Sequence, residues 1–278
     1  MYKTILVHVD ETARSAQRIH LAARMARQYE AHLVGAAMTG LSAYMFPVNS
    51  MDPGEPAIVF PLEELRGQAN LALDLFDKVA KGEGVHAFER RLVDDEAAVG
   101  ICLQARYSDL VVISQTAPDE FLPRLRSDFP EYVLLNSARP VLALPYAGVQ
   151  GDIGSNVTVA WNGSAEAVRA ITSALPLLKR AQQVHLVVFN AALDADVHGQ
   201  EPGADMGLYL ARHGIKVEVT ATDAGLDDGD ALLSFAADSG ADLIVMGAYG
   251  HSRFHEAILG GMTRTALASS PVALWMCH

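Results

Sequence analysis

The sequence carries the same order of apolar runs twice, and this repetition limits the chain to folds that a duplicated unit can form. Each half predicts a strand, a helix, a strand, a variable segment, a short strand, a helix, a strand, a helix and a last strand. The matched runs of the two halves are Lys3–Asp10 with Asn156–Asn162, Ala31–Ala37 with Val184–Phe189, Ser108–Ser114 with Ala241–Gly247, and Ser137–Leu144 with Ser269–Trp275.

The alternation of apolar strands with amphipathic helices predicts an α/β fold. Near-continuous apolar strands are typical of parallel sheets that helices cover on both faces. Leu92–Val93 and Val217–Thr220 supply the middle strands, and apolar residues such as Ile19 and Leu232 recur at helical spacing in the helices. Right-handed crossovers then give two tandem, doubly wound, five-stranded parallel-sheet domains, each with its ligand crevice at the carboxyl ends of the strands.

A glycine-rich stretch without apolar periodicity, Pro145–Gly154, separates the halves. We therefore expect domains at residues 1–147 and 154–278. The first half is about 20 residues longer, and the surplus is most simply placed at residues 41–60, which are unusually apolar for a loop. Two interpretations of this segment carry equal weight: a lid or partner surface, and a structural flap that packs on its own domain.

Composition narrows the range of partners. The 278 residues carry a net charge of −12, which argues against nucleic-acid binding and against an anionic membrane surface. No apolar run approaches the 18 residues that a membrane-spanning helix needs, and the first residues do not resemble a signal peptide. Two cysteines fit a reducing compartment. We expect a cytoplasmic protein.

Glycines cluster near the end of the second half. Gly247 and Gly250 follow the apolar run Asp242–Met246, and Gly260 and Gly261 open a helical pattern. Glycine lets the backbone approach an anion, and a helix N-terminus offers free N–H groups to it. This pattern predicts a phosphate site, with turn formation and close helix packing as the structural alternative.

The duplicated half-domain, the Gly-x2-Gly-x9-Gly pattern and the final Pro-Val strand together resemble the universal stress protein family in its tandem form. The resemblance covers essentially the whole chain. It implies a five-stranded parallel α/β domain that often binds ATP or another adenine nucleotide, here with Mg²⁺ as an accompanying ion. It also implies pairing of the two halves through their last strands, while the sequence leaves a further homodimer open.

The resemblance also implies a set of binding residues. The family's glycines fall on Gly247, Gly250 and Gly260, whereas its phosphate-binding hydroxyl position is Gly261 and its acidic residue after the first strand is Asn162. Thr263 offers a hydroxyl from the first helical turn, and Arg253 a guanidinium within reach of terminal phosphates. The expected nucleotide-binding residues are Ala160, Trp161, Asn162, Phe189, Met246, Gly247, Gly250, His251, Arg253, Gly260, Gly261, Met262 and Thr263.

The first half lacks this pattern. Ser114–Glu120 and Leu125–Pro130 stand where the glycines are expected, Pro118 has no N–H, and the carboxylates of this stretch would repel phosphate. Asp10 remains at the end of the first strand, where it also suits a helix start. We expect this half to be structural or regulatory.

No catalytic residue or metal site is predicted. His251 and His255 are four residues apart but lack a third zinc ligand, so a polar surface is favoured. Asp227–Asp230 lacks the glutamate of a calcium loop and indicates a helix start. Ser164 is a natural helix cap.

Two functions therefore follow. The first is a stress-response regulatory protein that binds an adenine nucleotide in its second half, with at most weak ATP hydrolysis and an unidentified protein partner. The alternative is an interaction module that binds no nucleotide and uses residues 41–60 to bind a protein or an apolar ligand.

Overall fold

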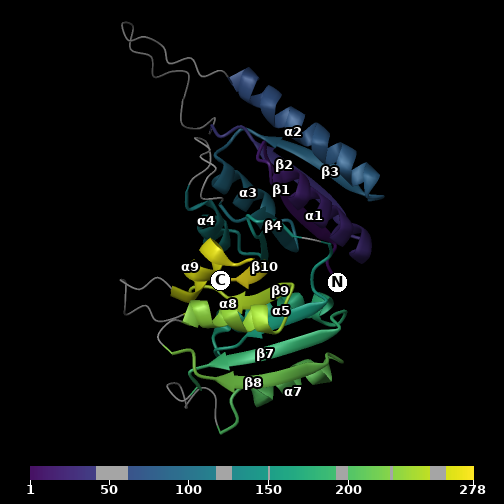
Figure 1. Ribbon diagram of the computed structural model, residues 1–278. Helices are drawn as coiled ribbons and strands as arrows, with labels where there is room; N and C mark the ends of the chain where they lie inside the picture. Colours follow the sequence, from purple (N-terminus) through teal and green to yellow (C-terminus); the bar gives the residue numbers. More distant parts are fainter. Residues whose placement is uncertain (42–61, 117–126, 150, 192–199, 226–227, 251–260) are drawn as a thin grey trace, which may run out of the picture. The chain divides into compact units, whose positions relative to one another are not determined.

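The computed structural model describes residues 1–41, 62–116, 127–149, 151–191, 200–225, 228–250 and 261–278 (Figure 1). The chain forms two compact units. The N-terminal unit comprises Tyr2–Val112 and Thr116–Ser137, and the C-terminal unit comprises Met1, Ile113–Gln115 and Ala138–His278. Of the apolar segment at 41–60, all but Leu41 lies outside the described residues.

The N-terminal unit contains a parallel sheet in the order β3-β2-β1-β4. In this sheet Ile5 of β1 lies opposite Leu33 on one side and Leu110 on the other. Helix α1 packs against α2, and α3 packs against α4. The elements in chain order are β1 (Thr4–Val9), α1 (Ser15–Tyr29), β2 (His32–Met38), α2 (Leu62–Gly82), β3 (Phe88–Val93), α3 (Ala97–Ala105), β4 (Leu110–Ser114) and α4 (Phe129–Asn136).

The C-terminal unit has the strand order β5-β10-β9-β6-β7-β8. All of these pairs are parallel except β5 with β10, the last strands of the two repeats, which pair antiparallel with Ala143 opposite Leu274. The elements are β5 (Val141–Leu144), β6 (Asn156–Ala160), α5 (Ala165–Leu178), β7 (Gln183–Phe189), α7 (Ala204–Arg212), β8 (Val217–Thr222), α8 (Asp228–Asp238), β9 (Leu243–Gly247), α9 (Gly261–Ser269) and β10 (Ala273–Cys277).

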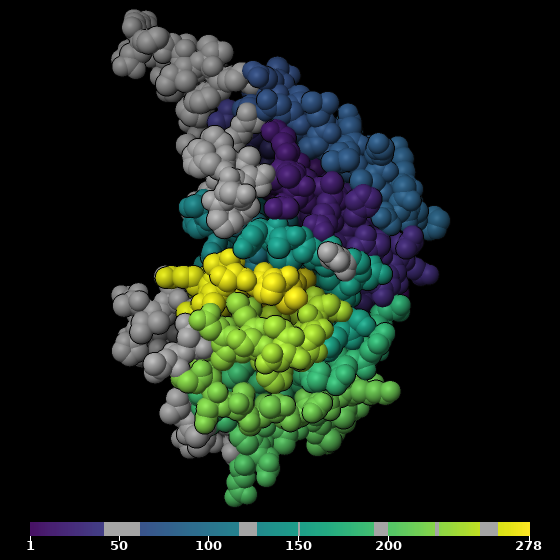
Figure 2. All heavy atoms as spheres, viewed as in Figure 1, coloured from purple at the N-terminus to yellow at the C-terminus, as the bar shows by residue number. Residues whose placement is uncertain are grey.

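This architecture confirms the predicted fold class, a doubly wound α/β sheet built twice. The apolar stripe expected of the first helix is buried at Ile19, Ala22, Ala23 and Ala26. In the space-filling view, the blue atoms of α2 form an outer face of the N-terminal unit (Figure 2). None of the helices within the described ranges has the length and hydropathy required to cross a membrane.

Two buried polar side chains of the C-terminal unit have hydrogen-bond partners inside it. Gln115 is 4% exposed; its amide nitrogen donates to the carbonyls of Ala266 and Ser270, and its oxygen accepts the N–H of Tyr146. The indole of Trp275, fully buried in β10, donates to the Ser173 hydroxyl at 2.9 Å. An unpaired polar group in these positions would cost about 1–3 kcal/mol, so each pairing helps to define one arrangement of the core.

Candidate functional site

The reversal of strand order in the C-terminal unit lies between β6 and β9. From β6 the sheet continues through β7 to β8, and from β9 it continues to β10. Helices that start from neighbouring strands at such a point leave on opposite faces, so a crevice opens at the carboxyl ends of the two strands. Trp161 and Asn162 follow β6 directly, and β9 ends at Gly247. The fold thus brings the two predicted halves of the site to one edge of the sheet.

Gly247 lies directly against the first turn of α5. A Cβ atom added there would lie 2.5 Å from the backbone nitrogen of Ala167 and 2.8 Å from the carbonyl carbon of Glu166. Contacts this short do not occur between real atoms, and backbone atoms of a helix cannot rotate away. Gly247 is therefore required for close packing of strand and helix, whatever else the turn binds.

The turn after Gly247 is held by two backbone contacts. The N–H of Ala248 donates to the carbonyl of Cys277, and the N–H of Tyr249 donates to Thr263 Oγ1 at 3.2 Å. Tyr249 has a φ of 56°, a left-handed conformation that is uncommon outside glycine. Thr263 is only 3% exposed, so its hydroxyl oxygen fixes this turn to the start of α9.

Gly250 faces two side chains of α5. A Cβ atom added there would lie 2.7 Å from Glu166 Oε2 and 3.1 Å from Ser164 Oγ. Ser164 caps α5 by accepting the N–H of Ala167, the role that the sequence predicts for it. Glu166 accepts a hydrogen bond from Arg169, whose Nε also donates to the carbonyl of His278. A carboxylate is therefore placed beside the glycine turn.

The other end of the crevice carries aromatic and amide groups. Asn162 is exposed, and its Oδ1 accepts the N–H of Ser164. Trp161 is half-buried, with its N–H bound to the carbonyl of Val187. Phe189 is half-buried at the end of β7 and meets Phe235 edge-on, with 6.4 Å between ring centroids. Ala160 and Met246 are buried within their strands.

Helix α9 begins at Gly261. Outside the backbone of this helix, no atom of the described residues lies within 4 Å of the position that a Cβ atom of Gly261 would take. The first backbone N–H groups of such a helix have no partner within the helix and bind anions well. Met262 beside it is half-buried. His251, Arg253 and Gly260 lie outside the described residues, as do His255 and Glu256.

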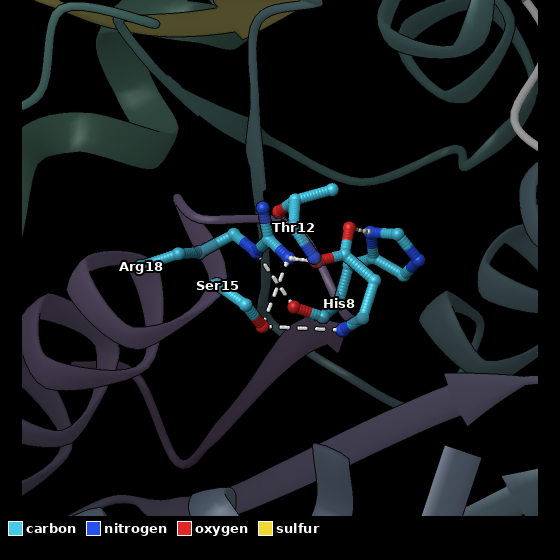
Figure 3. Close-up of polar contacts among 5 residues, drawn as sticks. His8, Thr12, Ser15 and Arg18 are labelled. Atoms are coloured by element: carbon cyan, nitrogen blue, oxygen red, sulfur yellow. Dashed lines mark hydrogen bonds and ion pairs between the residues drawn. The ribbon is translucent and has the colours of Figure 1, made fainter. Parts of the chain in front are cut away.

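In the N-terminal unit, the loop after β1, which corresponds to the loop after β6, is bound by the unit's own side chains. Arg18 of α1 is 2% exposed and points to the loop that follows β1, with His8, Thr12 and Ser15 around it (Figure 3). Its Nη2 lies 2.9 Å from Asp10 Oδ1, and its Nε donates to the His8 carbonyl at 2.6 Å. Thr12 donates to the same Asp10 oxygen.

Sequence reasoning missed Arg18. Its signal was present, because Arg18 lies on the face of α1 that also carries Ser15, Ile19 and Ala22, all of them buried. A charge on a buried helix face requires a buried partner. Asp10, expected at a helix start or a ligand contact, instead forms the ion pair that satisfies Arg18.

The electrostatics of this cluster fix its protonation states. Burial lowers the pKa of His8 to about 4. The negative charge of Asp10 opposes this shift, and the positive charge of Arg18 adds to it. Burial would raise the pKa of Asp10, but the charge of Arg18, His8 and the Thr12 hydrogen bond together hold it well below its ordinary value. At neutral pH the cluster is therefore a neutral imidazole beside an ionised pair.

The lowered pKa of His8 predicts acid sensitivity. Between pH 6.5 and about 4 the unfolded chain binds a proton at His8 that the folded chain does not, so the free energy of unfolding falls as the pH is lowered. The full effect is about 3 kcal/mol. Urea unfolding at pH 7.5, 6 and 5 should show this fall, and the His8→Gln variant should show a shallower one. Equal slopes in both proteins would contradict the assignment.

Among the residues whose placement is described, no group of three His, Cys, Asp or Glu side chains lies close enough together to hold a metal ion. Asp228 and Asp230 lie in the first turn of α8, as expected of a helix start. Asp228 also accepts a hydrogen bond from the amide of Asn190 at 2.6 Å.

The chain contains two doubly wound α/β units with the same strand order, and the C-terminal unit has a glycine turn at its switch point. These features define the class of protein. The model of the universal stress protein family matches residues 1–145 and again 155–278. The chain therefore belongs to the universal stress protein family, and it carries the family's domain twice.

Solved structures share this fold over the whole chain. A universal stress protein from Archaeoglobus fulgidus DSM 4304 is 18% identical with a TM-score of 0.73, and the match covers 99% of this chain and 95% of that one. A putative universal stress protein from Pseudomonas aeruginosa UCBPP-PA14 is 12% identical with a TM-score of 0.62, over 99% and 92%. A functionally unknown protein from Pseudomonas aeruginosa PAO1 is 14% identical with a TM-score of 0.64, over 99% and 92%. No curated protein is significantly similar in sequence.

Proposed function

We propose that the second repeat, residues 154–278, binds an adenine nucleotide, and that the first repeat, residues 1–147, does not. The observation that carries this proposal is the difference between the two switch points. In the C-terminal unit, Asn162 after β6 is exposed, and no described atom outside α9 lies within 4 Å of a Cβ position at Gly261, where this helix begins. In the N-terminal unit, Asp10, which follows β1 as Asn162 follows β6, is bound by the buried Arg18.

The ligand would lie across the carboxyl ends of β6 and β9. Trp161 and Phe189, both half-buried, are suited to contact the flat base, and Asn162 offers an amide that both donates and accepts hydrogen bonds. The phosphate end would bind at the start of α9, where backbone N–H groups need no basic side chain. Mg²⁺ would accompany the phosphates of ATP, without a described acidic cluster to hold it.

The role we assign to this site is regulatory. Binding would change the surface that the protein presents to a partner in a cytoplasmic stress response, with slow turnover or none. No positioned nucleophile or general base is evident in the sequence, so any hydrolysis would depend on bound Mg²⁺ and positioning. The residues expected at the site, Gly247 and Gly250 among them, would then serve both the fold and the ligand.

A negative charge introduced by substitution at the start of α9 tests the proposed phosphate site directly. Gly261→Asp adds a carboxylate where no described atom outside α9 lies within 4 Å, so the fold should tolerate it, and an acidic residue in the first turn suits the helix dipole. We expect calorimetric titration with AMP to show affinity at least tenfold lower than in the wild type, since like charges disfavour the complex by about 1.4 kcal/mol or more.

Gly261→Asn is the matched control, because it has the shape of aspartate without the charge. It should bind AMP within about threefold of the wild type. Equal affinity in the Asp and Asn variants would place the phosphate elsewhere. If no adenine ligand binds to the wild type at millimolar concentration, the interaction module using residues 41–60 becomes the better account.

A further inference from the structure

The side chain of Glu166 projects toward the glycine turn of the C-terminal unit. The nearest atom to a Cβ atom added at Gly250 would be Glu166 Oε2, at 2.7 Å. Glu166 lies in the first turn of α5, which packs so closely on Gly247 that no Cβ atom fits between them. A phosphate group bound at this turn would therefore meet a carboxylate.

That carboxylate is held in place and ionised. Its side chain is 18% exposed and pairs with Arg169, which is itself bound to the carbonyl of His278. Burial would raise the pKa of Glu166, but its own backbone N–H, Arg169 and His278 together lower it below its ordinary value. Arg169 thus pairs with Oε1 of the carboxylate, whereas Oε2 is the oxygen that lies toward Gly250.

Two hydroxyl groups near the turn accept hydrogen bonds from backbone N–H groups, and each keeps its own O–H proton to donate. Thr263 Oγ1 accepts the N–H of Tyr249, and Ser164 Oγ accepts the N–H of Ala167. Gly261 contributes no side chain, and Arg264, the cation in the first turn of α9, is exposed. Apart from the exposed Arg264, Ser164 and the described residues 247–250 and 261–264 offer an anion neutral N–H and O–H donors. Among these residues, each added negative charge on a ligand is repelled by the full charge of Glu166, whereas the neutral donors attract it less strongly.

We propose that Glu166 is a specificity-determining residue that disfavours polyphosphates at the Gly247–Gly250 turn, so that the site selects adenine ligands of low charge, a nucleoside or nucleoside monophosphate, over a triphosphate. This inference rests on the proposed adenine site of the second repeat. The carboxylate of Glu166 lies toward Gly250, where the phosphate end would bind, so adenosine, which has no phosphate, is the uncharged reference ligand.

The test is calorimetric titration of three proteins with adenosine, AMP and ATP. The proteins are the wild type, Glu166→Gln and Glu218→Gln. Glu218 is the matched control, because it lies near the amino end of the edge strand β8, 66% exposed and away from the switch point, and the substitution removes the same charge. Arg169 is 49% exposed, and exposed ion pairs contribute little to folding, so all three proteins should remain folded.

We expect the wild type to bind AMP more tightly than ATP. Glu166→Gln should raise the affinity for ATP about tenfold, raise that for AMP less, and leave that for adenosine unchanged. Glu218→Gln should leave all three affinities within about twofold of the wild type, because salt screens a distant exposed charge.

Different failures have different meanings. If the wild type binds ATP and Glu166→Gln binds it equally well, Glu166 does not set specificity, although the adenine site stands. An equal gain in Glu218→Gln would assign the effect to net charge and overturn the role of Glu166. If no protein binds any of the three ligands, the adenine site itself is wrong, and this inference is wrong with it.

Discussion

Replacing Arg18 by methionine should destabilise the N-terminal unit by about 3 kcal/mol. The substitution removes the guanidinium that lies 2.9 Å from Asp10 Oδ1 and leaves the aspartate partly buried without its cation. Loss of one partner of a buried pair typically costs about 3–5 kcal/mol, and the 19% exposure of the Asp10 side chain places this pair at the lower end. Urea unfolding at pH 7.5 measures the difference.

The double variant Arg18→Met with Asp10→Asn separates charge from packing. Thr12 and Ser15 still contact position 10 in this variant, and no uncompensated charge remains. The double variant should therefore be more stable than the sum of the two single losses predicts. A cost below about 1 kcal/mol for Arg18→Met would mean that the cluster does not occupy the first switch point as the structure indicates.

A single added methyl group at Gly247 should cost about 3 kcal/mol of folding free energy. In Gly247→Ala the new Cβ atom would lie 2.5 Å from the backbone nitrogen of Ala167, so α5 must move away from β9. Overpacking of this kind usually costs about 1–3 kcal/mol, and contact with backbone atoms sets the upper value. Thermal and urea unfolding both report the change.

Gly261→Ala is its counterpart within the same glycine pattern. No atom of the described part of the chain outside α9 lies within 4 Å of the added atom, and alanine favours the helix, so stability should stay unchanged or rise by up to about 1 kcal/mol. Equal losses at Gly247 and Gly261 would contradict the distinction between a packing glycine and an open one.

The sequence predicted the strands, helices and switch points well because their signals are local. Apolar runs followed by Asn162 or Gly247 mark strand ends, and the structure places both residues at the carboxyl ends of adjacent strands. Ser164 was assigned as a cap from its type and position, and its hydroxyl accepts the N–H of Ala167. Neither inference needs any contact distant along the chain.

The residue-by-residue equivalence of the two repeats was harder to predict from the sequence. The matched runs set His32 beside His185, but His32 lies opposite Thr4 in the sheet, and Gln183 lies opposite the equivalent Asn156. The correct equivalence of the second strands is therefore shifted by two residues, so that His32 corresponds to Gln183. Strands buried on both faces are apolar throughout, and without an alternating pattern nothing in the sequence fixes their register.

Polar contacts between residues far apart in the sequence could not be predicted, for a different reason. Nothing near Glu166 in the sequence indicates that it faces Gly250, because the contact depends on the close approach of β9 and α5. The amide of Gln115 likewise bonds to carbonyls 151 and 155 residues away. Such contacts follow from how the elements pack, and composition or periodicity does not encode them.

The most direct test of this account is the number of adenine ligands that one chain binds. Calorimetric titration of the intact protein with AMP should give one site per chain, because Asp10 at the first switch point is bound by Arg18, whereas Asn162 at the second is exposed. Two sites per chain, or no binding of AMP, ATP or adenosine at millimolar concentration, would contradict it.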